Sequence, residues 1–298
     1  MGSYKALVVF SLEFFLSLEF FSNRGNALGL ITKQANKIRS KGMAGKYQTL
    51  IYKRKGTRAL IIFNRPHILN AVAMEGAHEL DALAERIATD PDIRIVTIKG
   101  AGRAFSTGID LNDLSKGLID NSYFDLWDRA LRRFETMDKL VLCLIHGYAL
   151  GGGLQLALAA DIRVCTPSAK LGLPAIKEGL IPGLGTLRLA RYIGLGRAKR
   201  LIITGEMIDG IEGERMGMVD YLVAEDEAVA EFEKIVDRVS AVNSKGCRLS
   251  KEMLTSCYDT DFETFFSLYK ERQLHATNSD DFAEAMAAYN EKRPPKWG

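Results

Sequence analysis

Two loops built from small residues each follow a hydrophobic stretch and could present backbone N–H groups to a ligand. They are "AFSTGIDL" (104–111) and "GYALGGGLQ" (147–155). Glycine permits sharp turns and close approach of a ligand atom to the main chain. A helix that begins at Gly152 or Gly153 would direct unpaired N–H groups at that atom. N–H groups from two loops could form an oxyanion hole for a thioester carbonyl. For either loop alone, a tight turn that packs a helix against a sheet is the alternative.

Gln155 is the one polar side chain between Gly153 and Asp161, where a buried first helical turn is expected. A carboxamide orients a water molecule or a substrate oxygen through hydrogen bonds, but it does not take up a proton as a carboxylate does. We therefore expect Gln155 to position water or a polar group of a substrate.

The elements that must hold these loops alternate between strand and helix patterns, which predicts an α/β domain with largely parallel strand pairing. The first two strands flank the glycine turn "RKGT" and are expected to form a hairpin. The predicted strands are 47–53, 58–63, 93–100, 140–145, 162–166 and 219–223, and the predicted helices include 74–89, 123–137 and the segment after the glycines. From residue 226 on, the chain reads as helices. We therefore divide it into an N-terminal extension (1–45), an α/β core (46–225) and a helical C-terminal region (226–298).

The composition describes a globular protein with no strongly charged surface. The chain has 298 residues, 47% of them hydrophobic, and a formal net charge of +3, which argues against a nucleic-acid-binding protein. The four cysteines are dispersed and have no zinc-site spacing, so we expect neither a disulfide nor a metal site. Cys143 and Cys165 lie in apolar runs and are expected to be buried free thiols.

The first 45 residues differ from the rest and are left out of the fold prediction. The apolar run 6–21 is too short for a membrane span, and Glu13 and Glu19 interrupt it, so we expect no stable span. Three interpretations stay open: a basic targeting extension, a membrane-surface helix, or dispensable sequence upstream of an alternative start at Met43. A cytoplasmic location is expected, with organelle targeting by residues 1–45 left open.

Over residues 47–293 the sequence resembles the crotonase superfamily, the enoyl-CoA hydratase/isomerase family. The stretches that match, in order, are "NRPHILNA" (64–71), "GRAFSTGIDL" (102–111), "HGYALGGGLQLALAADIRV" (146–164), "GLIPGLGTLRLARYIG" (179–194), "TGEMIDGIEGERMGMVDYLV" (204–223) and "FAEAMAAYNEKRPPKW" (282–297). The resemblance implies a spiral of strand–strand–helix repeats with a helical C-terminal region that assembles as a homotrimer or a dimer of trimers. It does not specify the reaction, because one fold hosts many chemistries.

The resemblance also implies where an acyl-CoA thioester would bind. By position, the backbone N–H groups of Thr107 and Gly152 would form the oxyanion hole. Residues near the CoA moiety would be Arg65, Ala71, Ile109, Asp110 and Leu111. For Asp110, a helix-capping role is favoured over a catalytic one, and for Arg65 a structural role is the alternative. No cofactor is expected beyond the coenzyme A of the substrate.

Two departures from the family pattern put the reaction in doubt. Hydratases of the family carry a glutamate where this chain has Gln155, and a second glutamate where it has Ala175 after Pro174. Hydration of a double bond needs a base for water and an acid for the α-carbon. We therefore do not expect the usual two-glutamate hydration, and expect hydrolysis, decarboxylation or an unusual hydration or isomerisation.

Several residues could substitute for the two glutamates. Glu178 lies one helical turn beyond Ala175, with a surface carboxylate paired with Lys177 or Arg188 as the alternative. His146 at a strand end is expected to serve packing or hydrogen bonding. Other candidates are His67, on a loop, and Tyr123, Asp125, Trp127 and Asp128, on the helix that borders the acyl pocket in relatives. A non-catalytic acyl-CoA-binding or scaffolding protein is the alternative function, since it would also lack these carboxylates.

Overall fold

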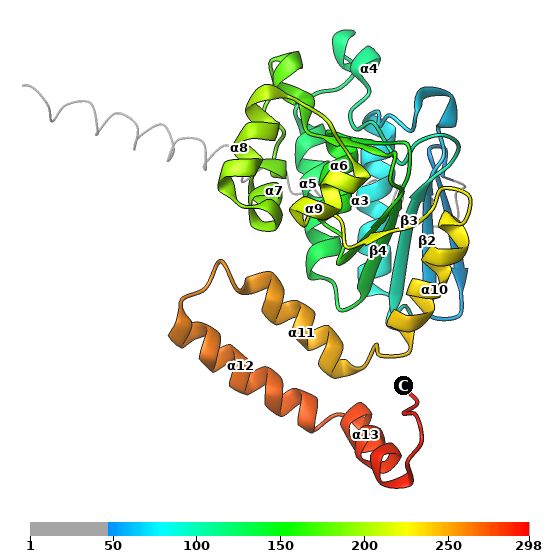
Figure 1. The fold of residues 1–298 in the computed structure, drawn as a ribbon, viewed down its shortest axis with the longest axis vertical. Helices are drawn as coiled ribbons and strands as arrows, with labels where there is room; N and C mark the ends of the chain where they lie inside the picture. The colour runs from blue at the N-terminus through cyan, green and yellow to red at the C-terminus, as the bar shows by residue number, and fades with distance from the viewer. Residues whose placement is uncertain (1–46, 298) are drawn as a thin grey trace, which may run out of the picture. The chain divides into compact units, whose positions relative to one another are not determined.

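A six-stranded sheet lies at the centre of the protein, whose computed structural model describes residues 47–297 (Figure 1). The antiparallel hairpin of β1 (Leu50–Lys55) and β2 (Arg58–Phe63) forms one edge, as predicted. Four strands continue the sheet in parallel: β3 (Ile95–Gly100), β4 (Leu140–Ile145), β6 (Ile162–Cys165) and β9 (Tyr221–Leu222). The predicted α/β class with largely parallel pairing is therefore confirmed. The N-terminal extension and Met43 lie outside the described residues.

A second, three-stranded sheet is a feature that the sequence analysis does not predict. It consists of β5 (Tyr148–Leu150), β7 (Lys170–Gly172) and β8 (Ile208–Asp209). Strands of two or three residues are too short to show an alternating pattern. β4 is followed by β5 and helix α6 (Gly152–Leu158), and β6 is followed by β7 and helix α7 (Gly185–Ile193). The chain thus visits both sheets before each of these helices, which is the predicted strand–strand–helix repeat.

Helices cover both faces of the six-stranded sheet (Figure 1). On one face lie α3 (Met74–Thr89), α5 (Ser122–Thr136) and α6, and on the other lies α10 (Ala228–Ser240). The predicted helices 74–89 and 123–137 are confirmed to within one residue at each end. The elements at the rim of the core are α4 (Leu111–Ser115), α8 (Leu195–Thr204), α9 (Gly210–Met216) and the 3₁₀ turns η1 (Pro66–Ile68) and η2 (Pro174–Glu178).

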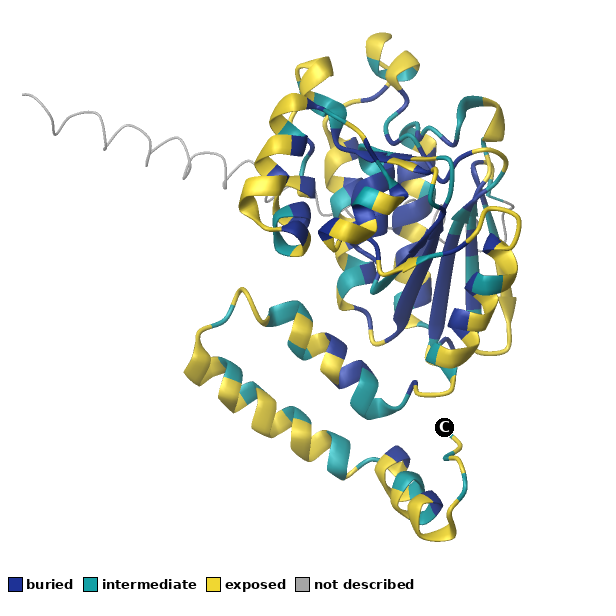
Figure 2. Cartoon of the chain, viewed as in Figure 1, coloured by how far each residue is buried: buried dark blue, intermediate teal, exposed yellow. Residues whose placement is uncertain are grey.

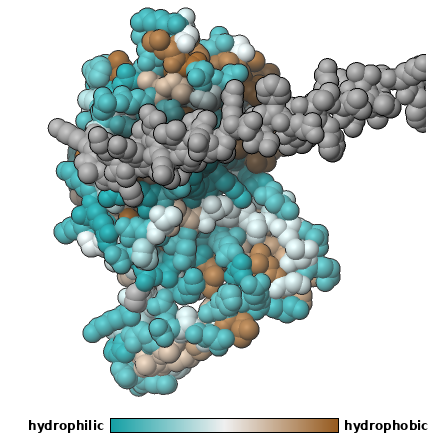
Figure 3. Space-filling model, turned by 180° about the vertical axis from the view of Figure 1, so that it is seen from behind, coloured by the Kyte–Doolittle hydropathy of each residue, from teal (hydrophilic) through white to brown (hydrophobic). Residues whose placement is uncertain are grey.

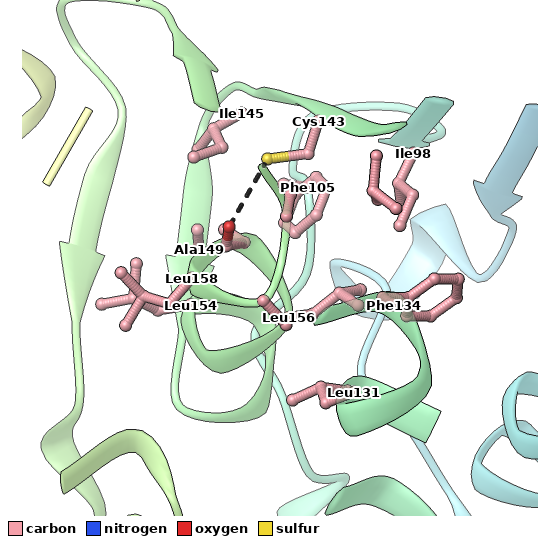
Figure 4. Packing of buried hydrophobic residues seen from close by; sticks show 14 of the residues in the cluster. Ile98, Phe105, Leu131, Phe134, Cys143, Ile145, Ala149, Leu154, Leu156 and Leu158 are labelled. Atoms are coloured by element: carbon pink, nitrogen blue, oxygen red, sulfur yellow. Dashed lines mark hydrogen bonds between the residues drawn. The ribbon is translucent and has the colours of Figure 1, made fainter. Parts of the chain in front are cut away.

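Strand β4 shows why its sequence, "LVLCLI", is apolar throughout rather than alternating. Leu142 and Leu144 pack against α10, while Val141 and Cys143 face the helices on the other side. Both faces of a parallel strand are buried in this architecture, so every side chain contributes to a core. The Cys143 thiol lies 3.9 Å from the Ala157 carbonyl oxygen of α6, among buried hydrophobic side chains (Figure 4). Cys143 and Cys165 are buried and free, as expected.

The residues after the predicted boundary at residue 225 are helical, and the first of these helices packs on the six-stranded sheet. Phe232 and Val236 of α10 are buried in the same cluster as Leu142 of the sheet, so α10 belongs to the core. The helices α11 (Lys245–Ser256), α12 (Phe262–Thr277) and α13 (Asp280–Glu291) follow, and α12 buries none of its side chains (Figure 2). Within residues 47–297, no helix combines the length and the apolar character that crossing a membrane requires.

Candidate active site

The two glycine-containing loops lie side by side, joined by backbone hydrogen bonds. Ser106 N–H donates to the Tyr148 carbonyl at 3.0 Å, and Leu150 N–H donates to the Ser106 carbonyl at 3.0 Å. A Cβ atom on Gly153 would lie 2.2 Å from the Ser106 carbonyl oxygen, so only glycine permits this approach. Gly153 therefore serves close packing, which is the alternative that the sequence left open for each loop.

Gly152 has a different position, because its N–H group is free. It is the first residue of α6, and Gly151 before it turns the chain with φ +51. Among residues 47–297, no acceptor binds the Gly152 N–H. The indole of Trp127 lies against it, since a Cβ on Gly152 would be 3.3 Å from Trp127 Cε2. The free N–H is thus the one donor of the predicted pair that is available without rearrangement.

The N–H of Thr107, the other predicted donor, already has a partner. It donates to the Leu69 carbonyl oxygen at 3.2 Å. Leu69 presents this oxygen because it ends η1 in the left-handed region, with φ 55. A ligand oxygen would therefore have to share or replace the Leu69 carbonyl at Thr107.

Asp110 has the helix-capping role that the sequence favours. Its side chain caps α4 by accepting hydrogen bonds from the N–H groups of Asn112 and Asp113. Asp110 Oδ2 also pairs with Arg65 Nη1 at 3.0 Å, and the same nitrogen donates to the Ala71 carbonyl. Arg65 therefore joins the segment around Ala71 to the segment around Asp110, both of which were expected to border CoA. This is the structural role that was the alternative for Arg65.

The other residues expected near CoA lie together on these two segments. Ala71 precedes Val72, which forms a parallel bridge with Ile109. Leu111 begins α4 with 48% of its surface exposed. Contact of these residues with CoA stays a prediction.

Asn70 is a positioning residue whose role the sequence analysis does not identify. It is buried, and its amide nitrogen donates to the carbonyls of Ala101 and Ala104 at 2.9 and 2.8 Å. Ser106 Oγ in turn donates to the Asn70 carbonyl at 2.8 Å. These bonds hold the loop that carries Thr107. The available signal was an amide side chain inside the otherwise apolar stretch "ILNAV".

Gln155 is buried in the first turns of α6, as expected, and its amide is unpaired. Only 7% of its surface is exposed, and its side chain makes no hydrogen bond within residues 47–297. The segment before α7 covers it closely, because a Cβ on Gly185 would lie 2.9 Å from Gln155 Cγ. A Cβ on Gly183 would lie 3.3 Å from Gln155 Oε1. The amide is thus available to a ligand or to water in a confined space.

The same space is bordered by Asp128 of α5. The Cβ position of Gly183 lies 3.6 Å from Asp128 Oδ2. Asp128 Oδ1 pairs at 3.2 Å with Arg188 of α7, which is buried and also bonds Glu135. Burial raises the pKa of the Asp128 carboxyl above its usual range, and the Arg188 hydrogen bond and charge partly oppose this rise. The structure therefore brings one of the four candidates on this helix to Gly183, the glycine that Gln155 also borders.

Two hydrogen-bond donors on α5 lack partners. Tyr123 Oη and Trp127 Nε1 are both buried and make no hydrogen bond to any part of the chain that the structure describes. Their rings stack with centroids 6.1 Å apart. A buried donor without an acceptor costs ~1–3 kcal/mol, so these two groups lower the stability of the packing around α5.

The remaining candidates are not brought to this space. Glu178 is exposed at the end of η2 and forms no ion pair within residues 47–297. The expected surface position of Glu178 is confirmed, but neither suggested partner, Lys177 or Arg188, pairs with it within residues 47–297. Arg188 binds two carboxylates from α5 instead. His146 Nε2 lies 3.1 Å from the Gly102 carbonyl, a structural contact as expected. His67 and Asp125 are exposed.

Comparisons with known proteins give one consistent result. Residues 53–298 match the family model described as enoyl-CoA hydratase/isomerase. A probable enoyl-CoA hydratase of Mycobacterium tuberculosis is 33% identical over 84% of this chain and 98% of its own length. The short-chain-enoyl-CoA hydratase of Clostridium acetobutylicum is 31% identical over 82% of this chain and 95% of its own. The crystal structure of an enoyl-CoA hydratase from Bacillus anthracis superposes with a TM-score of 0.78 at 29% identity, covering 84% of this chain and 99% of that one. The chain therefore belongs to the enoyl-CoA hydratase/isomerase family of the crotonase superfamily.

Proposed function

We propose that the protein is an enzyme that binds an acyl-CoA thioester and stabilises the negative charge that develops on its carbonyl oxygen. The observation that supports this most directly is the free Gly152 N–H at the contact of the two loops. The N–H of Thr107 is the second donor, once the thioester oxygen takes it from the Leu69 carbonyl. One such donor typically lowers the barrier of acyl chemistry by ~3–4 kcal/mol. The CoA moiety is bound by the segments that Arg65 joins to Asp110, including Ala71, Ile109 and Leu111.

The reaction differs from two-glutamate hydration in its acid and base. Gln155 orients a water molecule or a substrate oxygen, because its buried amide has no partner within residues 47–297. Ala175 supplies neither acid nor base. The candidates are hydrolysis, decarboxylation, or an unusual hydration or isomerisation. Glu178 could act in them only if η2 rearranged, since its side chain is exposed.

The test compares two substitutions at Gly152 that differ in the N–H group. Gly152→Pro removes the N–H at the first helical position, where proline is tolerated. Gly152→Ala keeps the N–H and adds a Cβ 3.3 Å from Trp127 Cε2, so both variants crowd the indole to a similar extent. Turnover of a panel of saturated, unsaturated, 3-hydroxy and 3-oxo acyl-CoAs is measured with each. We expect Gly152→Pro to be at least ~100-fold slower than Gly152→Ala. Equal rates for two folded variants would refute the oxyanion assignment.

A non-catalytic acyl-CoA-binding protein is the second candidate, and the absence of glutamate at 155 and 175 favours it. The same panel decides between the two. Calorimetric binding of CoA thioesters by the wild type, with no turnover of any of them, would establish this second function.

We further propose that the chain assembles as a homotrimer or a dimer of trimers. The exposed side chains of the last helices include many large hydrophobic groups, which an aqueous surface does not favour. They are Phe262, Phe266, Tyr269, Leu274, Phe282, Met286 and Tyr289. Hydrophobic side chains interrupt the surface in the lower part of Figure 3, where these helices lie. Light scattering that gives a monomer mass at micromolar concentration would contradict this assembly.

A further inference from the structure

On the proposed function, the enzyme needs a group that exchanges protons with its substrate. Gln155 and Ala175 cannot do so. Asp128 is a carboxylate that, like Gln155, borders Gly183. Apart from Gly183 and its chain neighbours, the three atoms nearest to the Gly183 Cβ position are Gln155 Oε1, Asp128 Oδ2 and Gln155 Nε2, at 3.3, 3.6 and 4.0 Å.

The two oxygens of Asp128 have separate roles in this geometry. Oδ1 accepts a hydrogen bond from Arg188 Nη1 at 3.2 Å, which fixes the carboxylate plane. Oδ2, the oxygen that borders Gly183 together with Gln155, accepts no hydrogen bond within residues 47–297. Trp127, the preceding residue on α5, packs its indole against Gly152. One helix therefore borders the free N–H with one side chain and presents a carboxylate oxygen with the next.

The environment of Asp128 suits both uptake and release of a proton. Its side chain is 27% exposed, and burial is the largest cause that raises its pKa. Arg188 of α7 lowers the pKa, while Glu135 and Asp125 of α5 raise it further. A carboxyl whose pKa approaches the working pH is the more effective general acid and base.

We propose that Asp128 is the catalytic acid/base of this enzyme, acting beside Gln155 on the α-carbon of the acyl group. The α C–H bond breaks as Oδ2 takes the proton, and the electron pair moves onto the thioester oxygen to form an enolate next to the Gly152 N–H. The reverse step returns a proton from Oδ2 to carbon. This inference rests on the proposed function, because it requires a bound acyl-CoA.

The experiment measures exchange of α-protons for deuterium in butyryl-CoA and 3-hydroxybutyryl-CoA in D₂O, by mass spectrometry, alongside calorimetric affinity. Asp128→Asn keeps the shape and removes the base. We expect exchange to fall at least ~100-fold with affinity changed less than ~3-fold. Glu233→Gln, on the exposed face of α10, is the control for loss of one carboxylate and should exchange as the wild type does. The wild-type rate should also rise with pH through one ionisation that Asp128→Asn lacks.

The outcomes separate the two proposals. Exchange by Asp128→Asn within ~3-fold of the wild type overturns the role of Asp128 and leaves the proposed function standing. A wild type that binds both thioesters but neither exchanges nor turns over any acyl-CoA overturns the proposed function, and the role of Asp128 with it. If Asp128→Asn fails to fold, Asp128→Glu replaces it. This variant moves the carboxylate by one methylene and should slow exchange at least ~10-fold at unchanged affinity, and undiminished exchange again overturns the proposal.

Discussion

Gly153 offers a sharp test of the contact between the two loops. In Gly153→Ala the new Cβ would lie 2.2 Å from the Ser106 carbonyl oxygen and 2.9 Å from the Ser106 carbonyl carbon. Both are backbone atoms, so α6 or the loop must move by roughly 1 Å, at the typical cost of an overpacked core, ~1–3 kcal/mol. Higher helix propensity of alanine offsets at most ~1 kcal/mol of this. We expect a net loss of ~1–2 kcal/mol, equivalent to a drop in Tm of roughly 2–8 °C.

The matched control is Gly196→Ala in α8, where a Cβ would meet no atom within 4 Å. It should leave the free energy of unfolding unchanged or raise it by up to ~1 kcal/mol. Urea unfolding followed by circular dichroism measures both variants. The displaced loop should also weaken turnover in Gly153→Ala, because Ser106 adjoins Thr107. A Gly153→Ala protein as stable as Gly196→Ala would refute the close packing of the loops.

Three further predictions test the framework around the site. Arg188→Met leaves Asp128 without its cation, whereas Glu135 still pairs with Arg132. Urea unfolding should show a loss of about 3–5 kcal/mol, and a loss below ~1 kcal/mol would contradict the buried ion pair of Arg188 with Asp128. Asp110→Ala removes the cap of α4 and should lower stability by ~0.5–2 kcal/mol in thermal melts, whereas an unchanged Tm would show that the cap is dispensable. The Arg293 hydrogen bond lowers the pKa of the Glu284 carboxyl in α13 from its ordinary 4.5 to about 2. This contact therefore stabilises the fold of α13 fully above pH 4.5, and that stabilisation is lost as the pH falls towards 2. Fluorescence of Trp297, whose indole N–H donates to the Ala241 carbonyl at 2.7 Å, should report that transition in the wild type and not in Glu284→Gln.

The meeting of the two glycine loops was predictable because it follows from local pattern and topology. Parallel strands end at the same edge of a sheet, so the loops after β3 and β4 had to be neighbours. The cap by Asp110 was predictable for a similar reason, since a cap depends only on the next three residues.

The environment of Gln155 was not predictable in the same way. Asp128 is brought to it by the packing of α5 on α6, and Arg188 is held by ion pairs with a helix more than fifty residues earlier in the chain. Such pairings depend on tertiary distances that no spacing in the sequence encodes. The bond from Thr107 to the Leu69 carbonyl escaped prediction because it depends on the left-handed backbone of Leu69, a residue type that rarely adopts it.

The Leu69 carbonyl has a consequence for how strongly a substrate can be bound relative to its transition state. On the proposed function, a thioester oxygen gains the Thr107 N–H only by displacing an acceptor of similar strength, so a neutral ground-state carbonyl gains little from the exchange. A charged enolate or tetrahedral oxygen forms a hydrogen bond roughly twice as strong as a neutral one. It therefore displaces the Leu69 carbonyl from the Thr107 N–H with a net gain in free energy. Displacing the Leu69 carbonyl costs the same free energy in the bound substrate and in the transition state, so the difference between their hydrogen-bond energies at Thr107 is unchanged. The net stabilisation at Thr107 is thereby reserved for the reacting state, which is the condition for raising the turnover rate rather than the affinity.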